Sequence, residues 1–272
     1  MSEPLWATDG FIRRAGPERP GPEGPGAGKT SGPPPVTARL EIIAIHGIGE
    51  IRPGDEIAEL LADAADAQGT PLADRDCLVV TQKIVSKAEG RLVALDPGDL
   101  DARRALVEQE SRRIVRRRGD LIISETHHGF VCANAGIDLS NVEDGQAALL
   151  PVDPDSSAHH VRNALRARRG VEVAVIVSDT FGRPWRMGLT DVAIGVAGIA
   201  AVVDLRGSED ALGRVLQVTE VAIADEIASA AELVMGKAAG VPVAIVRGLD
   251  PGWFGAGAAR DLVRDPQEDL FR

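Results

Sequence analysis

Two lysines four positions apart follow an apolar run in the segment TQKIVSKAEGR, residues 81–91. Lys83 and Lys87 stand there beside a glycine, and two ammonium groups so placed suit the phosphate chain of a nucleotide. Taken alone, the pattern is more typical of a solvated strand end. Its meaning depends on two further polar segments.

The second segment, residues 125–141, is rich in glycine and in oxygen donors. The glycines allow tight turns and close approach of a ligand to the backbone. Carboxylate, hydroxyl and amide oxygens are ligands that Mg²⁺ and Mn²⁺ select. A polar turn explains the segment equally well, and its adjacent histidines lack zinc-site spacing. The candidate donors are Asp138, Ser140 and Asn141.

The third segment, residues 178–195, begins where a strongly apolar run ends. Asp179 and Thr180 come directly after that run, and Arg183 and Arg186 flank a Pro-Trp pair. A carboxylate and a hydroxyl on a metal ion, with arginines on an anionic substrate, is what phosphoryl transfer requires. A plain strand end would explain the aspartate but not the whole group. Together the three segments predict metal-dependent handling of a nucleotide polyphosphate and leave the acceptor open.

A phosphate-binding P-loop is not part of this prediction, although GPGAGKT at 24–30 is similar to one. The full motif needs a glycine where Glu23 stands, and it needs a strand before and a helix after it. Proline-rich sequence lies on both sides instead. Residues 1–37 have too few large apolar groups to offset their ordering entropy, so we expect a disordered tail there and one folded domain over 38–272.

The elements that must position these groups alternate irregularly between strand and helix patterns, which predicts a mixed α/β or α+β fold built on mixed sheets. The apolar 170–180 run predicts a buried strand. The arginine-rich segment 101–118 is expected to be helical, with a solvated face. Strands are expected over 38–48, 76–86, 120–126, 170–180, 199–205 and 241–248, and helices over 53–69, 101–118 and 219–237.

Composition narrows the class of protein. The 272 residues carry a formal net charge of −11, which argues against a nucleic-acid partner. Only 3% are aromatic, so the core must be aliphatic. Cys77 and Cys132 stand far apart and predict reduced, buried thiols. No apolar run approaches a membrane span, and the N-terminus lacks a signal-peptide pattern, so we expect a soluble cytoplasmic protein without a membrane partner.

Five segments together resemble the coenzyme F420 gamma-glutamyl ligase family. They occur in the family's order and cover most of the chain from about residue 40. The matching segments are GIGEIRPGDEI (47–57), VTQKIVSKAEGR (80–91), HGFVCANAGIDLSN (128–141), SDTFGRPWRMGLTDVAIGVAGI (178–199) and MGKAAGVPVAIVRG (235–248).

This resemblance implies a specific reaction and assembly. GTP activates a carboxylate of the deazaflavin precursor F420-0 as an acyl phosphate, and the amine of L-glutamate then attacks it. The products are F420 with one or more glutamates, GDP and phosphate. Members of the family have a mixed-sheet fold of their own type and form an intertwined homodimer.

The resemblance also assigns residues to roles. Mg²⁺ or Mn²⁺ would be held by Asp138, Asp179 and Thr180, with K⁺ as a further ion. Asp138, Asp179 and Arg183 would act in catalysis, Arg183 and Arg186 being candidates for the substrate phosphate. Where the family often has arginine, this chain has His127. GTP would be contacted by Gly47, Ile48, Gly49, Glu50, Gln82, Lys83, Lys87, Asn141, Met235, Gly236 and Lys237.

Three alternative functions stay open from the residues alone. The first is an amide ligase for another phosphorylated acid. The second is a nucleotide-binding protein without catalysis, which would predict broken metal positions. The third is a metal-dependent phosphohydrolase, which would release phosphate from GTP without needing glutamate.

Overall fold

The computed structural model describes residues 39–140, 142 and 144–270. The expected tail, the rejected P-loop and Asn141 lie outside the described residues. These described residues belong to one compact unit. None of its described helices is long and apolar enough to cross a membrane.

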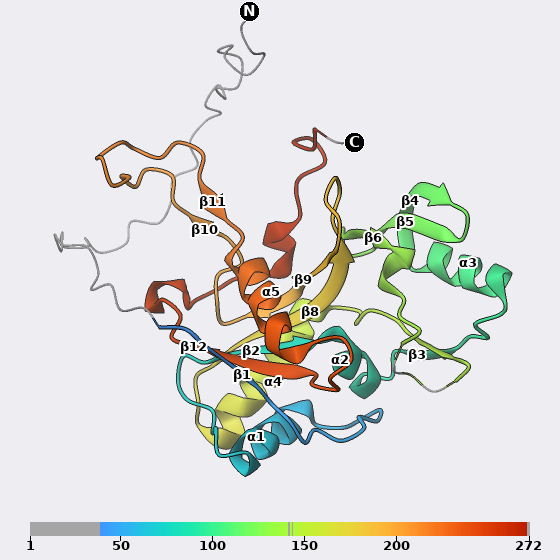
Figure 1. Ribbon diagram of the computed structural model, residues 1–272, viewed down its shortest axis with the longest axis horizontal. Helices are drawn as coiled ribbons and strands as arrows, with labels where there is room; N and C mark the ends of the chain where they lie inside the picture. The colour runs from blue at the N-terminus through green and yellow to red at the C-terminus, as the bar shows by residue number, and fades with distance from the viewer. Residues whose placement is uncertain (1–38, 141, 143, 271–272) are drawn as a thin grey trace, which may run out of the picture. The chain divides into compact units, whose positions relative to one another are not determined.

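A mixed five-stranded sheet forms the centre of this unit (Figure 1). Only β2 and β8 are parallel neighbours, and the other adjacent pairs are antiparallel. This confirms the predicted mixed α/β fold. The strand order is β1 (Glu41–Ala44), β12 (Val243–Arg247), β2 (Cys77–Thr81), β8 (Ala174–Gly182) and β9 (Leu189–Ala197).

Both faces of the sheet are buried, which explains why its strands are continuous apolar runs. Alternate residues point to opposite faces. Val80 and Val175 pack on one face with α1 (Ile57–Ala67) and α4 (Pro154–Arg169), while Ile176 packs on the other with α5 (Ile223–Met235). The core is aliphatic, as the composition predicts.

Smaller elements surround the central sheet. A three-stranded antiparallel sheet contains β4, β5 and β6, and two-stranded ladders join β3 to β7 and β10 to β11. Their bounds are α2 (Gln82–Ala88), β3 (Leu92–Ala94), α3 (Leu100–Gln109), β4 (Ser111–Arg118), β5 (Leu121–Thr126), β6 (Val131–Ala133), η1 (Asn134–Gly136), β7 (Gln146–Ala148), β10 (Val203–Asp204), β11 (Glu220–Val221), η2 (Pro251–Trp253) and η3 (Ala259–Leu262).

Two predicted elements are wrong in ways that matter for the site. The strand expected over 76–86 ends at Thr81, and helix α2 begins at Gln82. The helix expected over 101–118 ends at Gln109, and the arginines after it lie on strand β4, which pairs with β5. In the second place a long-range backbone ladder overrides the local pattern.

The strand expected over 199–205 is limited to the two residues of β10. Helix α4 was not predicted. Yet α4 carries clear end signals. The Asp153 side chain accepts a hydrogen bond from the Ser156 amide, Pro154 stands at the first turn, and Gly170 ends the helix with a left-handed conformation.

Candidate functional site

A cavity of about 380 Å³ opens where the pairing of β2 with β8 ends, at Thr81 and Ser178. Because these strands are parallel neighbours, their carboxyl ends meet at one edge, the usual ligand position in α/β sheets. Thirteen predicted residues line it: Ile48, Gly49, Glu50, Gln82, Lys83, Lys87, Asp138, Ser140, Asp179, Thr180, Met235, Gly236 and Lys237.

Helix α2 supplies the basic wall of the cavity. Lys83 and Lys87 lie one helical turn apart on the same face of α2. Their four-residue spacing is therefore that of a helix face and not that of a solvated strand end. The Lys83 Nζ donates to Asp138 Oδ2 at 3.0 Å and to Ser140 Oγ at 2.8 Å. Lys87 is buried and forms an ion pair with Glu50, which is largely exposed.

Hydrogen bonds to one backbone segment hold α2 against the Asp138 loop. The Leu149 carbonyl accepts from Gln82 Nε2 at 2.9 Å and from Ser86 Oγ at 2.6 Å. Just before it, Ala148 exchanges both backbone hydrogen bonds with Asp138. The lysines and the Asp138 carboxylate are therefore positioned through the same stretch of chain.

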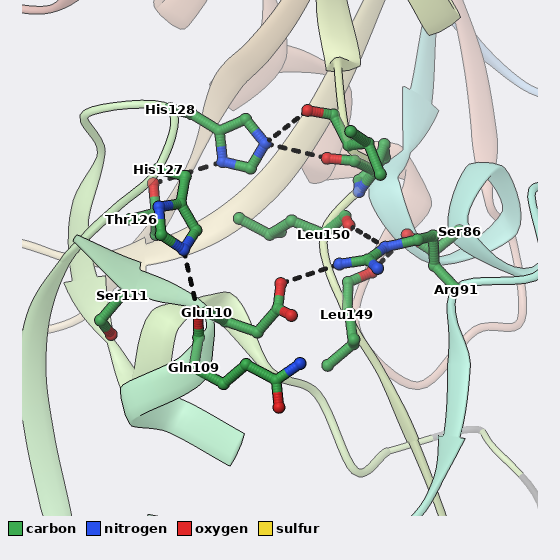
Figure 2. A network of polar contacts seen from close by, with 12 residues as sticks. Ser86, Arg91, Gln109, Glu110, Ser111, Thr126, His127, His128, Leu149 and Leu150 are labelled. Atoms are coloured by element: carbon green, nitrogen blue, oxygen red, sulfur yellow. Dashed lines mark hydrogen bonds and ion pairs between the residues drawn. The ribbon is translucent and has the colours of Figure 1, made fainter. Parts of the chain in front are cut away.

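The same backbone segment is held from its other side, as Figure 2 shows. The Leu150 carbonyl accepts from Arg91 Nε at 2.9 Å, and Arg91 also pairs with Glu110 at 2.8 Å. His128 Nε2 lies 2.9 Å from the Pro151 carbonyl, and His127 Nε2 lies 2.9 Å from the Gln109 carbonyl. Both histidines thus contact backbone in this network, and neither lines the cavity.

The pKa values of the two predicted metal-ligand aspartates are shifted in opposite directions. Burial raises the pKa of Asp138, but hydrogen bonds from Ser140 and the Lys83 ammonium outweigh it, so the pKa lies below its ordinary value. Burial, aided by the charges of Asp138 and Asp191, raises the pKa of Asp179 to about 7. A hydrogen bond donated by the Thr180 backbone amide and the charge of Lys237 oppose the shift only in part.

Sequence reasoning missed several cavity residues, among them Asp191, Glu232 and Ser178. The Asp191 carboxylate accepts from Thr180 Oγ1 at 2.6 Å and from Ser178 Oγ at 3.2 Å. Burial, then the charge of Asp191, raises the pKa of Glu232. The available signal for Asp191 was a carboxylate inside the otherwise apolar run DVAIGVA.

This arrangement fits a hard divalent cation. The charges of Asp138 and Asp191 help to raise the pKa of Asp179, and that of Asp191 helps to raise the pKa of Glu232, so a cation there would relieve the repulsion. Among the described residues no group of three or more His, Cys, Asp or Glu forms a ready-made metal site. Mg²⁺ often uses one or two carboxylates and completes its shell with hydroxyl, water and substrate phosphate oxygens. Asp138, Asp179 and Thr180 can supply the protein's share.

Among the described residues, three predicted ones do not line the cavity: Gly47, Arg183 and Arg186. Gly47 precedes the lining residue Ile48, with φ of 79°. Arg183 lies past the cavity in the turn between β8 and β9, where its Nη2 donates to the Met187 carbonyl at 2.6 Å. The same turn exposes Met187 and Trp185, which are 93% and 80% accessible. A role for Arg183 stays a prediction.

Both thiols are buried and free, as expected. Burial, with a smaller contribution from the charge of Asp179, raises the pKa of Cys132 to about 12, and burial raises that of Cys77 above its ordinary range. The reactive thiolate of Cys132 should therefore be about 10³-fold scarcer than for a free thiol. We expect a disulfide reagent at pH 8 to label neither cysteine on the timescale of minutes, and both once guanidinium unfolds the chain. Rapid labelling of the folded protein would contradict this.

A polar cavity at the carboxyl ends of parallel strands, with helices on both faces of the sheet, defines an α/β protein with an enzyme-type ligand site. Residues 47–248 match the family F420-0:Gamma-glutamyl ligase. A protein of Methanothermobacter thermautotrophicus, named Coenzyme F420:L-glutamate ligase, is 46% identical over 249 residues, covering 86% of this chain and 99% of the relative.

Two further relatives carry the same name. That of Methanopyrus kandleri is 42% identical over 254 residues, covering 87% of this chain and 98% of its own. That of Methanocaldococcus jannaschii is 42% identical over 252 residues, covering 86% and 97%. The chain therefore belongs to the F420-0:gamma-glutamyl ligase family and is an enzyme that forms carbon–nitrogen bonds. The family indicated by the sequence motifs is confirmed.

Proposed function

We propose that this enzyme attaches L-glutamate to F420-0, using GTP and Mg²⁺ or Mn²⁺, through an acyl-phosphate intermediate. The names of its relatives support the two substrates. The observation that supports nucleotide and metal binding is a single cavity in which Lys83, Lys87 and Lys237 lie beside the carboxylates of Asp138 and Asp179.

The reaction needs two bond exchanges. A substrate carboxylate oxygen attacks the γ-phosphorus, and the bond to the departing GDP breaks. The glutamate amine then attacks the acyl carbon, phosphate leaves with the carbon–oxygen bonding pair, and the amine loses a proton as the amide forms.

The chain's own contribution is to hold and neutralise the reacting groups. The lysine ammonium groups would bind phosphate oxygens and stabilise the charge that develops on them. Lys83 now pairs with Asp138, and Lys87 with Glu50, so bound phosphates would exchange partners with carboxylates. Asp138, Asp179 and Thr180 would hold the cation, which when bound polarises phosphate oxygens. Both cysteines are buried thiols, so no covalent enzyme intermediate is included.

The test is mass spectrometry of the products from F420-0, GTP, L-glutamate and Mn²⁺, with each component omitted in turn. We expect a product heavier by one or more glutamyl units only in the complete mixture, together with GDP. EDTA should abolish product formation, and excess Mn²⁺ should restore it. GDP release without glutamylated product would favour a different acceptor or a phosphohydrolase, and no GTP use at all would favour a non-catalytic binding protein.

An intertwined homodimer is also proposed. The apolar side chains exposed on the β8–β9 turn and on the segment between β10 and β11, among them Met187, Leu212 and Val218, support a protein contact there. Light scattering should give twice the chain mass of 28.6 kDa. A monomer mass at micromolar concentration would reject the dimer without affecting the ligase reaction.

A further inference from the structure

Asp191 is a buried carboxylate on an apolar strand. Asp191 is only 2% exposed. The next two residues along β9 are the apolar Val192 and Ala193. A buried charge is costly unless hydrogen bonds or an opposite charge compensate it. Among residues 39–140, 142 and 144–270 no cation forms an ion pair with Asp191. Its side chain is compensated by the hydroxyl groups of Ser178 and Thr180.

A register shift between β8 and β9 brings this carboxylate to Thr180. Before the shift Val177 pairs with Gly195, and after it Ser178 pairs with Ala193 and Thr180 with Asp191. If the earlier register had continued, Val192 would lie opposite Thr180. A shift of one residue exchanges the side chains that face each sheet surface, so the Asp191 carboxylate takes that position instead. Such irregularities often re-aim side chains beside active sites.

The strand around Asp191 is also fixed to helix α5. Ser229 Oγ donates to the Asp191 carbonyl at 2.7 Å and lies 2.9 Å from Thr190 Oγ1. Further along the same helix, Glu232 and Met235 line the cavity. The Asp191 carboxylate is therefore held by a rigid strand and helix, as a group that orients another must be.

The hydrogen bond to Asp191 determines what Thr180 offers the cavity. A hydroxyl group has one proton and two lone pairs. Thr180 Oγ1 donates to Asp191 Oδ1, 2.6 Å away, so its proton is committed to the carboxylate and its oxygen presents lone pairs to any third group. Lone pairs attract a cation, whereas a hydroxyl proton would repel one.

We propose that Asp191 is a positioning residue that aims the Thr180 oxygen at the divalent cation. This inference rests on the proposed metal-dependent function, because Thr180 is there a ligand. In this role Asp191 acts through Thr180 and not by direct contact with the nucleotide or the acceptor. Outer groups that orient a metal ligand in this way are commonly worth 10- to 100-fold in metal affinity.

The test measures Mn²⁺ binding directly, by the electron paramagnetic resonance signal of free Mn²⁺ in the presence of GDP. Asp191→Asn keeps the side-chain shape but weakens the bond that orients Thr180. We expect its Mn²⁺ affinity to fall about 10- to 100-fold. The matched control is Asp225→Asn, another partly buried carboxylate, which accepts from the Ala193 amide at 2.9 Å without touching Thr180. Its Mn²⁺ affinity should not change.

A double-mutant cycle separates positioning from direct binding. In a Thr180→Val background, adding Asp191→Asn should cost less than twofold in Mn²⁺ affinity, because the group through which Asp191 acts is gone. A full additive loss would overturn the positioning role and make Asp191 an independent binding group. If Asp191→Asn does not fold, Thr180→Ser and Thr180→Val decide: Ser should bind Mn²⁺ nearly as well as Thr, and equal binding by Val would overturn the proposal.

The outcomes also separate this inference from the proposed function. A wild-type protein that binds no Mn²⁺ and forms product in EDTA would overturn both. A wild-type protein that requires Mn²⁺, with Asp191→Asn binding it equally well, would overturn only the role of Asp191.

Discussion

Replacing Asp179 with Asn is expected to lower kcat by about 10²- to 10³-fold, as when a group that stabilises transition-state charge is removed. The fold should remain intact, because no described side chain forms an ion pair with Asp179 and the substitution keeps its shape. Steady-state kinetics at saturating GTP, F420-0 and Mn²⁺ would measure the loss. Unchanged kcat would remove Asp179 from the site chemistry.

The same variant should be more stable than the wild type in EDTA, and most clearly at high pH. The pKa of Asp179 is about 7 in the folded chain, compared with about 4 when unfolded. Between these values the folded state binds more protons, so the wild type loses stability from this group as pH rises. Asn does not titrate. The melting temperature of Asp179→Asn minus that of the wild type should therefore be larger at pH 8 than at pH 5.

Asp225→Asn provides the matched control. Burial also raises the pKa of Asp225, yet its carboxylate does not line the cavity. We expect the same direction of pH-dependent stabilisation without the loss of kcat. A similar loss of kcat in both variants would mean that the effect of Asp179→Asn comes from disturbed packing around β9.

Replacing Lys87 with Met is expected to weaken GTP binding by about 10²-fold, since loss of one partner from a buried charged contact commonly costs 2–5 kcal/mol. Lys87 is only 7% exposed and lines the cavity, so water cannot substitute for its ammonium group. Isothermal titration calorimetry with GTP and Mg²⁺ measures the change. Lys87→Arg should recover part of the affinity because it keeps the charge but not the geometry.

The control for Lys87→Met is Arg116→Met, which removes an exposed cation from β4 outside the cavity. It changes the net charge by the same amount and should leave GTP affinity within about twofold, because exposed charges at a distance are screened by salt. Equal losses in the two variants would indicate a general electrostatic effect. Unchanged GTP affinity in Lys87→Met would contradict a phosphate contact.

Much of the candidate site could be predicted because polar groups stand directly after apolar runs. Asp179 and Thr180 follow the apolar part of β8, Lys83 follows the end of β2, and all three line the cavity. Burial on both faces of a sheet leaves a continuous apolar run, which is visible in the sequence. The end of such a run marks where chemistry can begin, whether a loop or a helix follows.

Other features depended on pairings between distant segments. The arginines after Gln109 are on a strand because β5 supplies its backbone partner. Arg183 lies outside the cavity because the β8–β9 pairing continues past Asp179 as far as Gly182. Local propensity predicts neither feature, because a strand forms only when another segment completes its backbone hydrogen bonds.

By itself, the sequence determined the family, the aliphatic core buried on both faces of a mixed sheet, and the segments that carry carboxylates and lysines. Only the tertiary structure decided which side chains meet. Asp191 reaches Thr180 through a register shift, and Lys87 reaches Glu50 across 37 residues of chain. The physical reason is that side-chain type is local, whereas register and contact are set when distant strands and helices pack together.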